Sequence, residues 1–394
     1  MIIQKIYTLL YWSNNNRCLR LITKLFEGEL GDVVCINQSS LSSQINTKLL
    51  ISEKPIFICV ISYTATSENP GITIAGANPN LIKYTSPADA EFLYYGHCKC
   101  INAVPITPDG KPTPAIITRT ALQLSGIPFL VVDAGSKIKP LIPYISFNME
   151  SGKNIRFGKA MDINDIKKAF EYGTLLGSQL AKVNDFVIIG ESIPGGTTTA
   201  LGVLSALGIN AKFKVSSSMP ENPHLLKNQI VSEGMQNANI HFGELRNDPF
   251  TAISIVGDPM MPSVAGIVNG IINCGGKVML AGGTQMCSII AILKSLKCPL
   301  NGLCIGTTSY VADDPSSDLV NLVKQLTNDV PIYTTDLHMI ESSKLGLQSF
   351  AKGFIKEGVG AGGISIMAIV KSKGQIHGNV LLRAIEEEYV KVLM

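Results

Sequence analysis

Short apolar runs alternate with longer segments of helical period through most of the chain. Six runs rich in β-branched residues are expected to be strands, at residues 56–62, 128–135, 185–191, 252–258, 277–283 and 301–308. These runs are apolar at consecutive positions, whereas a strand with one solvated face alternates apolar and polar residues. Continuous apolarity favours strands that are covered on both faces, as in a parallel sheet with helical crossovers.

Segments with helical period separate the apolar runs. We expect helices at residues 166–182, 197–207, 263–273, 284–297 and 318–326, and nearer the chain ends at 17–26, 345–356 and 379–393. The fold class is therefore α/β, with a mostly parallel sheet and helices on both faces. Residues 55–336 are expected to form this large domain, and residues 1–54 and 337–394 a smaller, mainly helical piece that completes the site.

Glycine, hydroxyl and acidic residues follow the expected strands. In an open parallel sheet, ligands bind outside the carboxyl ends of the strands, where loops and helix N-termini meet. Each such turn alone is ordinary loop chemistry, but several at one sheet edge favour a ligand site. The candidate residues outside the two segments discussed next are Asp133, Gly135, Asp258, Gly282, Gly283 and Thr284.

One turn has the chemistry of an anion site. The strand ending at Glu191 is followed by Gly195 and Gly196, and then by Thr197 and Thr198 at the start of an apolar helix. The free backbone N–H groups of a helix start can bind a phosphate. The segment lacks the lysine of a P-loop and the spacing of a dinucleotide fingerprint. A monophosphate is thus the simplest anion it would bind.

A second segment, residues 354–370, has one carboxylate in a glycine-rich turn. Glu357 is followed by Gly358 and Gly360 and then by apolar sequence. Partial burial would raise the proton affinity of this carboxyl and suit it to act as a general base. The alternative is a surface glutamate near a helix end. Together, Glu191, Glu357 and a phosphate-type helix start are what a glycosyl or phosphoribosyl transfer would need.

Composition excludes several classes of protein. Hydrophobic residues make up 46% of the chain and charged residues 16%, which excludes disorder. The net charge of +3 is spread along the chain, without the basic cluster that a nucleic acid requires. No clean apolar run of about 20 residues is present, and no signal peptide is evident, so no membrane span is expected and the protein is expected to be cytoplasmic.

The nine cysteines do not suggest a disulfide framework, because their number is odd and most lie in apolar segments. The one suggestive group is His97, Cys98 and Cys100, which could supply three metal ligands. No second pair follows at the spacing of a zinc site. We therefore expect no metal site.

Six segments, in order along nearly the whole chain, carry a resemblance to a known family. They are residues 62–93, 131–135, 190–200, 256–268, 277–286 and 355–363. On these segments the sequence resembles the nicotinate-nucleotide-dimethylbenzimidazole phosphoribosyltransferases, and most closely their archaeal, formerly uncharacterised branch. The resemblance implies a Rossmann-like sheet with a small helical domain from both chain ends, and a homodimer.

The resemblance also implies an activity. Such enzymes displace nicotinate from nicotinate mononucleotide with a base, typically 5,6-dimethylbenzimidazole, and form the α-ribotide that becomes the lower ligand of cobalamin-type cofactors. No cofactor is implied. The family's Gly-Glu-Gly-x-Gly-Ala motif carries the catalytic carboxylate, and its match here assigns the general base to Glu357, with Lys356 in place of the first glycine.

A second family motif, Gly-Glu-Met-Gly-Ile-Gly-Asn-Thr-Thr, matches residues 190–198. Ile193, Pro194 and Gly196 differ from that pattern. These departures, with Lys356, favour one rival interpretation, a non-catalytic nucleotide-binding or regulatory protein on the same scaffold. A second alternative is an enzyme that uses another acceptor, such as adenine or a phenol.

Overall fold

Eight strands form one sheet in the computed structural model, which describes residues 32–38, 49–76, 78–102, 107 and 110–393. In spatial order they are β1 (Val33–Cys35), β8 (Ile332–Thr335), β7 (Leu303–Thr308), β6 (Lys277–Ala281), β5 (Phe186–Ser192), β2 (Pro55–Ile61), β3 (Phe129–Asp133) and β4 (Ile145–Ser146). All neighbouring strands are parallel except β1, which pairs antiparallel with β8. The mostly parallel α/β fold is confirmed.

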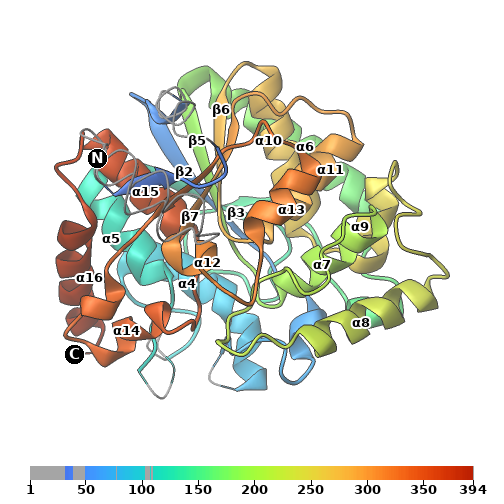
Figure 1. Cartoon of the computed structure of the whole chain (residues 1–394), viewed down its shortest axis with the longest axis horizontal. Coiled ribbons are helices and arrows are strands. Elements are labelled where there is room, and N and C mark those ends of the chain that lie inside the picture. Colours follow the sequence, from blue (N-terminus) through green and yellow to red (C-terminus); the bar gives the residue numbers. More distant parts are fainter. Residues whose placement is uncertain (1–31, 39–48, 77, 103–106, 108–109, 394) are drawn as a thin grey trace, which may run out of the picture.

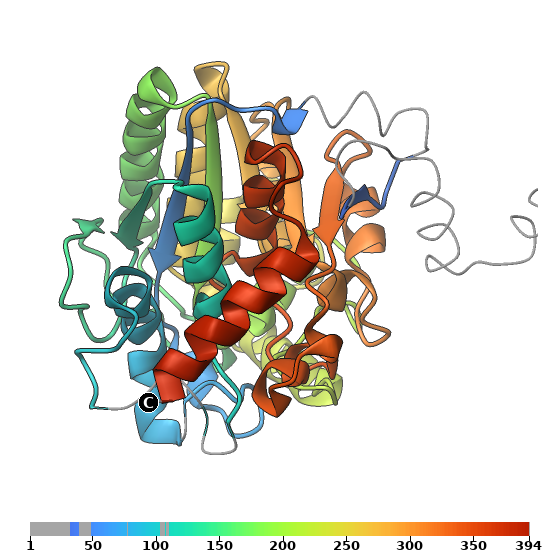
Figure 2. The same ribbon diagram turned by 90° about the vertical axis from the view of Figure 1, so that its left-hand side faces the viewer.

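Helices cover both faces of the sheet (Figure 1). The hydrophobic core on one face of the sheet includes residues of α6 (Ile163–Val183), α7 (Gly196–Ala206), α8 (His224–Asn237), α9 (Pro249–Val256), α10 (Met260–Asn273), α11 (Met286–Ser295) and α13 (Leu319–Leu326). The core on the other face includes residues of α4 (Thr85–Tyr95), α5 (Ala115–Ser125), α14 (Leu345–Ala351), α15 (Ala361–Lys371) and α16 (Gly378–Leu393). Figure 2 shows α16 crossing this second layer.

Strand β2 shows why continuous apolarity predicted this arrangement. Ile56, Ile58 and Val60 belong to the core on one face. Phe57 and Cys59 belong to the core on the other face. Because successive side chains of a strand point to opposite faces, a strand buried on both sides must be apolar throughout. The strands expected at residues 56–62, 128–135, 185–191, 277–283 and 301–308 are confirmed to within a few residues.

The strand expected at residues 252–258 is wrong, because these residues lie in helix α9 and the loop after it. The Asp248 side chain accepts a hydrogen bond from the Thr251 backbone N–H, and Pro249 occupies the first helical position. This is a typical helix start. A short apolar run does not by itself distinguish a buried strand from a buried helix. Asp258 therefore follows a helix rather than a strand.

Both ends of the chain contribute to the layers of the sheet. Strand β1 extends the sheet beyond β8, and α15 contacts β5, β6, β7 and β8. The division into a large domain and a smaller helical piece stays a prediction, and the helix expected at residues 17–26 lies outside the described residues. None of the helices in the described part of the chain combines the length and the apolarity needed to span a bilayer.

Candidate functional site

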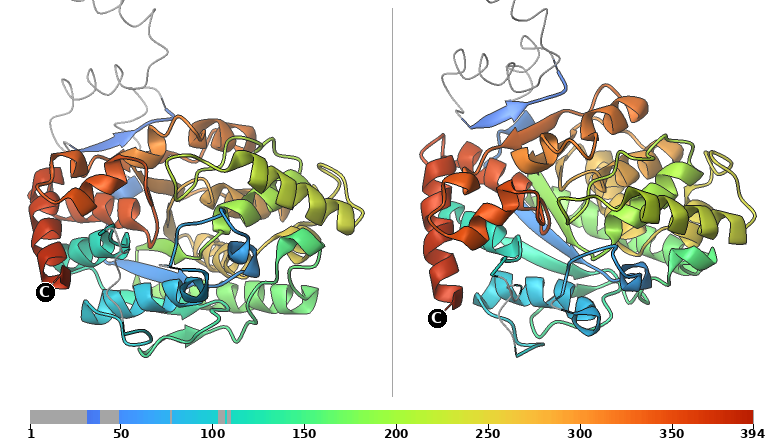
Figure 3. Two further views of the ribbon diagram at one scale, coloured as in Figure 1. Left: turned by 90° about the horizontal axis from the view of Figure 1, so that it is seen from below. Right: turned by 60° about the horizontal axis from the view of Figure 1, so that its bottom comes forward.

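A cavity of about 260 Å³ lies where the parallel strands end. The segments that follow β2, β5, β6 and β7 contribute to its wall. Seen from below, Figure 3 shows the segment after β2 in blue, lying between the red C-terminal helices and the yellow-green region of α8. Of the residues predicted for the site, those that line the cavity are Glu191, Gly195, Gly196, Thr197, Gly283, Thr284, Glu357 and Gly358.

Glu357 is held at the N-terminus of α15. Its carboxylate oxygens accept hydrogen bonds from the backbone N–H groups of Gly362 at 3.1 and 3.2 Å and of Thr308 at 3.0 Å. Thr307 donates a longer bond of 3.4 Å. These donors favour the ionised form, but burial outweighs them and raises the pKa of Glu357 from 4.5 to about 7. The carboxyl can therefore accept a proton near neutral pH.

Glu191, at the end of β5, is 9% exposed and lies beside the same cavity. Burial raises its pKa from 4.5 to about 8, and the negative charges of Asp258 and Glu357 add to the effect. The two glutamates differ because Glu357 receives several backbone N–H bonds that stabilise its negative charge. At pH 7, Glu191 is thus mostly protonated while Glu357 is partly ionised.

This protonation has a consequence for stability. The folded protein keeps a proton on Glu191 that the unfolded chain loses above about pH 4.5, so unfolding becomes easier as the pH rises from 4.5 to 8. The glutamine of Glu191→Gln is neutral at every pH, so we expect the stability of this variant to fall less than that of the wild type as the pH rises. Its thermal midpoint at pH 8 should exceed that of the wild type by a few degrees, with little difference at pH 4.5.

Calorimetry at pH 4.5 and pH 8 measures this effect, and Glu171→Gln on the exposed side of α6 is the matched control. The control should follow the wild type at both pH values. Asp89 and Asp258 also have pKa values raised to about 6 by burial, so some decline should remain in Glu191→Gln. If the thermal midpoint falls equally in Glu191→Gln and the wild type between pH 4.5 and pH 8, Glu191 is not protonated in the folded protein.

Two helices begin at the cavity wall. Gly195, at φ +81°, makes the turn into α7, and Gln285 immediately precedes α11. The backbone N–H groups of Gly196 and Thr198 already donate to the Ile193 and Gly195 carbonyls, at 3.2 and 2.9 Å. The side chain of Gln285 is 5% exposed, and its Nε2 has no hydrogen-bond partner among the described residues.

Gln285 therefore adds an unpaired donor to the two positive helix ends, next to Gly196. The sequence interpretation missed this residue, although it follows Thr284 directly. A buried amide donor without a partner costs free energy, unless a ligand accepts its hydrogen bond. This part of the cavity thus has the chemistry of an anion site.

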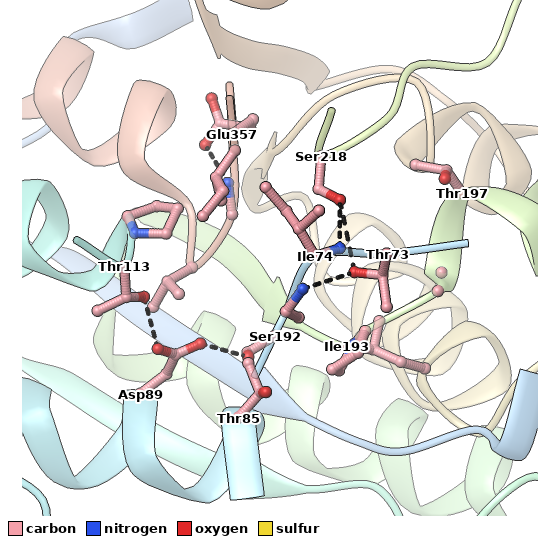
Figure 4. A pocket seen from close by; sticks show the side chains of 18 of the residues that line it. Thr73, Ile74, Thr85, Asp89, Thr113, Ser192, Ile193, Thr197, Ser218 and Glu357 are labelled. Atoms are coloured by element: carbon pink, nitrogen blue, oxygen red, sulfur yellow. Dashed lines mark hydrogen bonds between the residues drawn. The ribbon is translucent and has the colours of Figure 1, made fainter. Parts of the chain in front are cut away.

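Asp89 is a second residue of the cavity that the sequence interpretation did not single out. It lies on α4, beside the last residue of β5, and accepts hydrogen bonds from Thr113 Oγ1 at 2.6 Å and Ser192 Oγ at 2.7 Å. Figure 4 shows these bonds, with Glu357 on the same side of the pocket and Ser218 and Thr197 on the opposite side. No local signal in the sequence identifies Asp89, because Glu91 on the same helix is also acidic and buried.

The other predicted site residues lie outside the lining of the cavity. They are Asp133, Gly135, Thr198, Asp258, Gly282 and Gly360. Asp133 accepts bonds from Ser136 and Lys139. Asp258 accepts bonds from Thr199 and from the first turn of α10. These bonds hold the frame of the site, and a direct contact of these residues with substrate stays a prediction.

The four departures from the family motifs, Ile193, Pro194, Gly196 and Lys356, all line the cavity. Ile193 and Pro194 line it between Glu191 and α7. Lys356 is 4% exposed, and its Nζ pairs with Asp314 at 3.0 Å. Thr308 Oγ1 donates to the Lys356 carbonyl at 2.7 Å. The lysine is thus accommodated by an ion pair, and it leaves the Glu357 carboxylate in the cavity.

The group His97, Cys98 and Cys100 does not form a metal cluster. Cys98 Sγ donates to the Ala88 carbonyl at 3.8 Å, and the Cys100 backbone N–H donates to Glu91. Within residues 32–38, 49–76, 78–102, 107 and 110–393, no three His, Cys, Asp or Glu side chains are grouped as metal ligands.

A family model and several relatives are similar to this chain. A family model described as phosphoribosyltransferase matches residues 115–310. The UPF0284 protein of Methanothermobacter thermautotrophicus is 43% identical over 80% of this chain and 88% of that protein. The UPF0284 protein of Archaeoglobus fulgidus is 44% identical over 88% of this chain and 96% of that protein.

Solved structures show the same fold. CobT from Thermus thermophilus superposes with a TM-score of 0.55 at 16% identity, covering 86% of this chain and 84% of that one. A nicotinate-nucleotide-dimethylbenzimidazole phosphoribosyltransferase from the same organism gives a TM-score of 0.54 at 16% identity, covering 86% and 83%. The chain therefore belongs to the archaeal UPF0284 branch of the nicotinate-nucleotide-dimethylbenzimidazole phosphoribosyltransferase family.

Proposed function

We propose that this protein transfers the phosphoribosyl group of nicotinate mononucleotide to a benzimidazole-type base. The products are nicotinate and an α-ribazole 5′-phosphate for the lower ligand of a cobamide. One observation carries the proposal: Glu357 and the glycine-threonine turn before α7 line a single cavity. A base and an anion site in one cavity are what this transfer needs.

The proposed step is a single displacement at C1′ of the ribose. One nitrogen of the incoming base attacks C1′, and the bond from C1′ to the pyridinium nitrogen breaks with its electron pair going to that nitrogen. Glu357 accepts the proton from the other nitrogen of the base. Attack from the opposite face converts the β-configured donor into an α-configured product. The pyridinium nitrogen is formally cationic and leaves without being protonated.

Positioning supplies the larger share of the rate enhancement. Holding two reactants in line can lower a barrier by about 7 to 11 kcal/mol. General-base help worth 10² to 10⁴ in rate corresponds to about 3 to 5 kcal/mol. Glu191, which is mostly protonated at pH 7, adds little negative charge next to Glu357. Its neutral form leaves Glu357 as the group that accepts the proton.

We place the donor phosphate at the turn formed by Gly195, Gly196 and Thr197. The start of α7 and the unpaired Nε2 of Gln285 support this position. A helix N-terminus favours an anion by about 0.3 to 1 kcal/mol, and a hydrogen bond to a charged group adds about 1.5 to 3 kcal/mol. The phosphate should thus contribute strongly to donor binding.

Nicotinate mononucleotide should bind about 10²-fold more tightly than nicotinate riboside, which lacks the phosphate. Titration calorimetry of both compounds measures the difference. In Gln285→Leu the preference should shrink about tenfold or more, because the amide donor is lost. Gln325→Leu, at an exposed position of α13, is the matched control and should leave the preference unchanged. Equal affinities of the wild type for the two compounds would contradict the phosphate site.

The test of the proposed function is nicotinate release. The pure protein is incubated with nicotinate mononucleotide and a series of benzimidazoles and purines, and free nicotinate is measured by chromatography. Release that depends on the base supports the transfer. A protein that binds the nucleotide but releases no nicotinate with any base would instead be a binding or regulatory protein. The homodimer and the cytoplasmic location stay predictions.

A further inference from the structure

The Asp89 carboxylate lies at the cavity, and its hydrogen bonds leave some of its acceptor positions unused. Its side chain is 5% exposed and lines the cavity together with Tyr84, Thr85 and Ala88. Two hydroxyl groups donate to it, one to each oxygen. Each carboxylate oxygen can accept two hydrogen bonds, so both oxygens keep an acceptor position.

The charge of Asp89 is not compensated by a salt bridge to any of the described residues. The nearby Thr85 Oγ1 is also buried and has no hydrogen-bond partner in the described part of the chain. A buried carboxylate and a buried hydroxyl without full partners are costly, unless a ligand supplies donors. The setting thus points to a ligand that carries an N–H or O–H group.

The contacts around Asp89 join it to the loop that carries Glu357. Thr113 donates to Asp89. The ring of the next residue, Pro114, lies close to Gly358, since a Cβ added to Gly358 would be 3.3 Å from it. Thr118 on α5 donates to the Val359 carbonyl at 3.0 Å. Asp89 therefore lies on the Glu357 side of the cavity.

The anion site lies on the other side. Figure 4 shows Thr197 and Ser218 across the pocket from Asp89 and Thr113. A donor with its phosphate at Thr197 leaves the Glu357 side for the acceptor base. The residues that line the cavity next to Asp89 and Thr113, which are Tyr84, Ala88 and Pro114, suit a flat aromatic ring.

From this arrangement we propose that Asp89 sets acceptor specificity, and that the acceptor carries a hydrogen-bond donor on the ring edge remote from the attacking nitrogen. This inference rests on the proposed function. In this proposal, one ring nitrogen of the base faces C1′ and the other faces Glu357. The opposite edge of the base then faces the part of the cavity that Asp89 lines. An amino or hydroxyl group there would donate to the open acceptor positions of Asp89. A methyl group there would bury the carboxylate without a partner.

The experiment compares two bases of nearly equal size, 5-aminobenzimidazole and 5-methylbenzimidazole. Affinity is measured by calorimetry with the wild-type protein and no donor, and kcat/KM by nicotinate release. The amino compound should be preferred by about tenfold to hundredfold in both measurements, as expected for a hydrogen bond to a charged group. Equal values for the two bases, or a preference for the methyl compound, would overturn the inference.

Substitution of the carboxylate provides the second arm. In Asp89→Asn the preference for the amino base should fall to about threefold or less, because a neutral amide is a weaker acceptor. Asp329→Asn is the matched control, because Asp329 is exposed and does not line the cavity. This variant should keep the full preference. Retention of the full preference in Asp89→Asn would also overturn the inference.

The two hypotheses fail in different ways. Nicotinate release that proceeds equally well with both bases overturns the role of Asp89 and leaves the proposed transfer intact. Absence of release with every base overturns the proposed transfer, whereas calorimetry still tests the recognition of the amino group by Asp89. A calorimetric preference that disappears in Asp89→Asn supports that recognition in either case.

Discussion

Glu357→Gln should fold normally and turn over at least about 10²-fold more slowly than the wild type. The amide keeps the shape of the carboxylate and can still accept bonds from Thr308 and Gly362, but it cannot take a proton at neutral pH. The donor should bind with unchanged affinity, because the phosphate site that we propose lies at the other side of the cavity. Single-turnover kinetics with saturating base separates the chemical step from binding.

The pH profile gives this prediction a second readout. Because burial raises the pKa of Glu357 to about 7, the wild-type rate should fall as the pH drops through 7 and protonates the base. The residual rate of Glu357→Gln should lack this inflection. Glu171→Gln serves as the control and should behave as the wild type. A variant that folds and turns over at the normal rate would remove Glu357 from the mechanism.

Gly190→Ala should damage both stability and turnover. A Cβ at Gly190 would lie 2.7 Å from Gly360 Cα and 2.8 Å from Gly360 N, so two backbone segments would have to separate. These segments are the end of β5, which carries Glu191, and the start of α15, which holds Glu357. Overpacking of this kind costs about 1 to 3 kcal/mol. A displacement of about 1 Å in the site can lower turnover about 10²-fold.

Thermal unfolding and the nicotinate assay measure the two effects in the same preparation. Gly275→Ala is the control, because it adds the same methyl group at φ +75° with nothing within 4 Å. It should cost about 1 to 2 kcal/mol for its backbone conformation and leave turnover unchanged. Normal turnover in Gly190→Ala would show that the close approach of β5 and α15 does not set the geometry of the site.

Much of the fold could be predicted because burial on both faces leaves a clear pattern. The central strand β2 is apolar throughout, β5 is apolar until it reaches the site at Glu191, and amphipathic α6 shows the helical period. The pattern fails for α9, where a run of apolar residues is buried as a helix instead. Strand β8 was missed because four residues carry little signal.

The candidate site was predictable in part. Glu191, Glu357 and the turn before α7 could be identified because glycine and hydroxyl residues cluster around them. Asp89 could not, since its place at the cavity depends on how α4 packs beside β2 and β5. The raised pKa of Glu191 likewise depends on burial and on the charge of Asp258, which the fold brings near from a distant segment. Such proximity between remote residues has no signature in local sequence.

The most direct test of the central claim is the anomeric configuration of the product. The protein is incubated with β-nicotinate mononucleotide and a benzimidazole, and the ribotide is isolated and examined by proton NMR at C1′. An α-ribotide formed in equal amount to the released nicotinate is the predicted result. A β-ribotide, or nicotinate released without any ribotide, would contradict a single displacement assisted by Glu357.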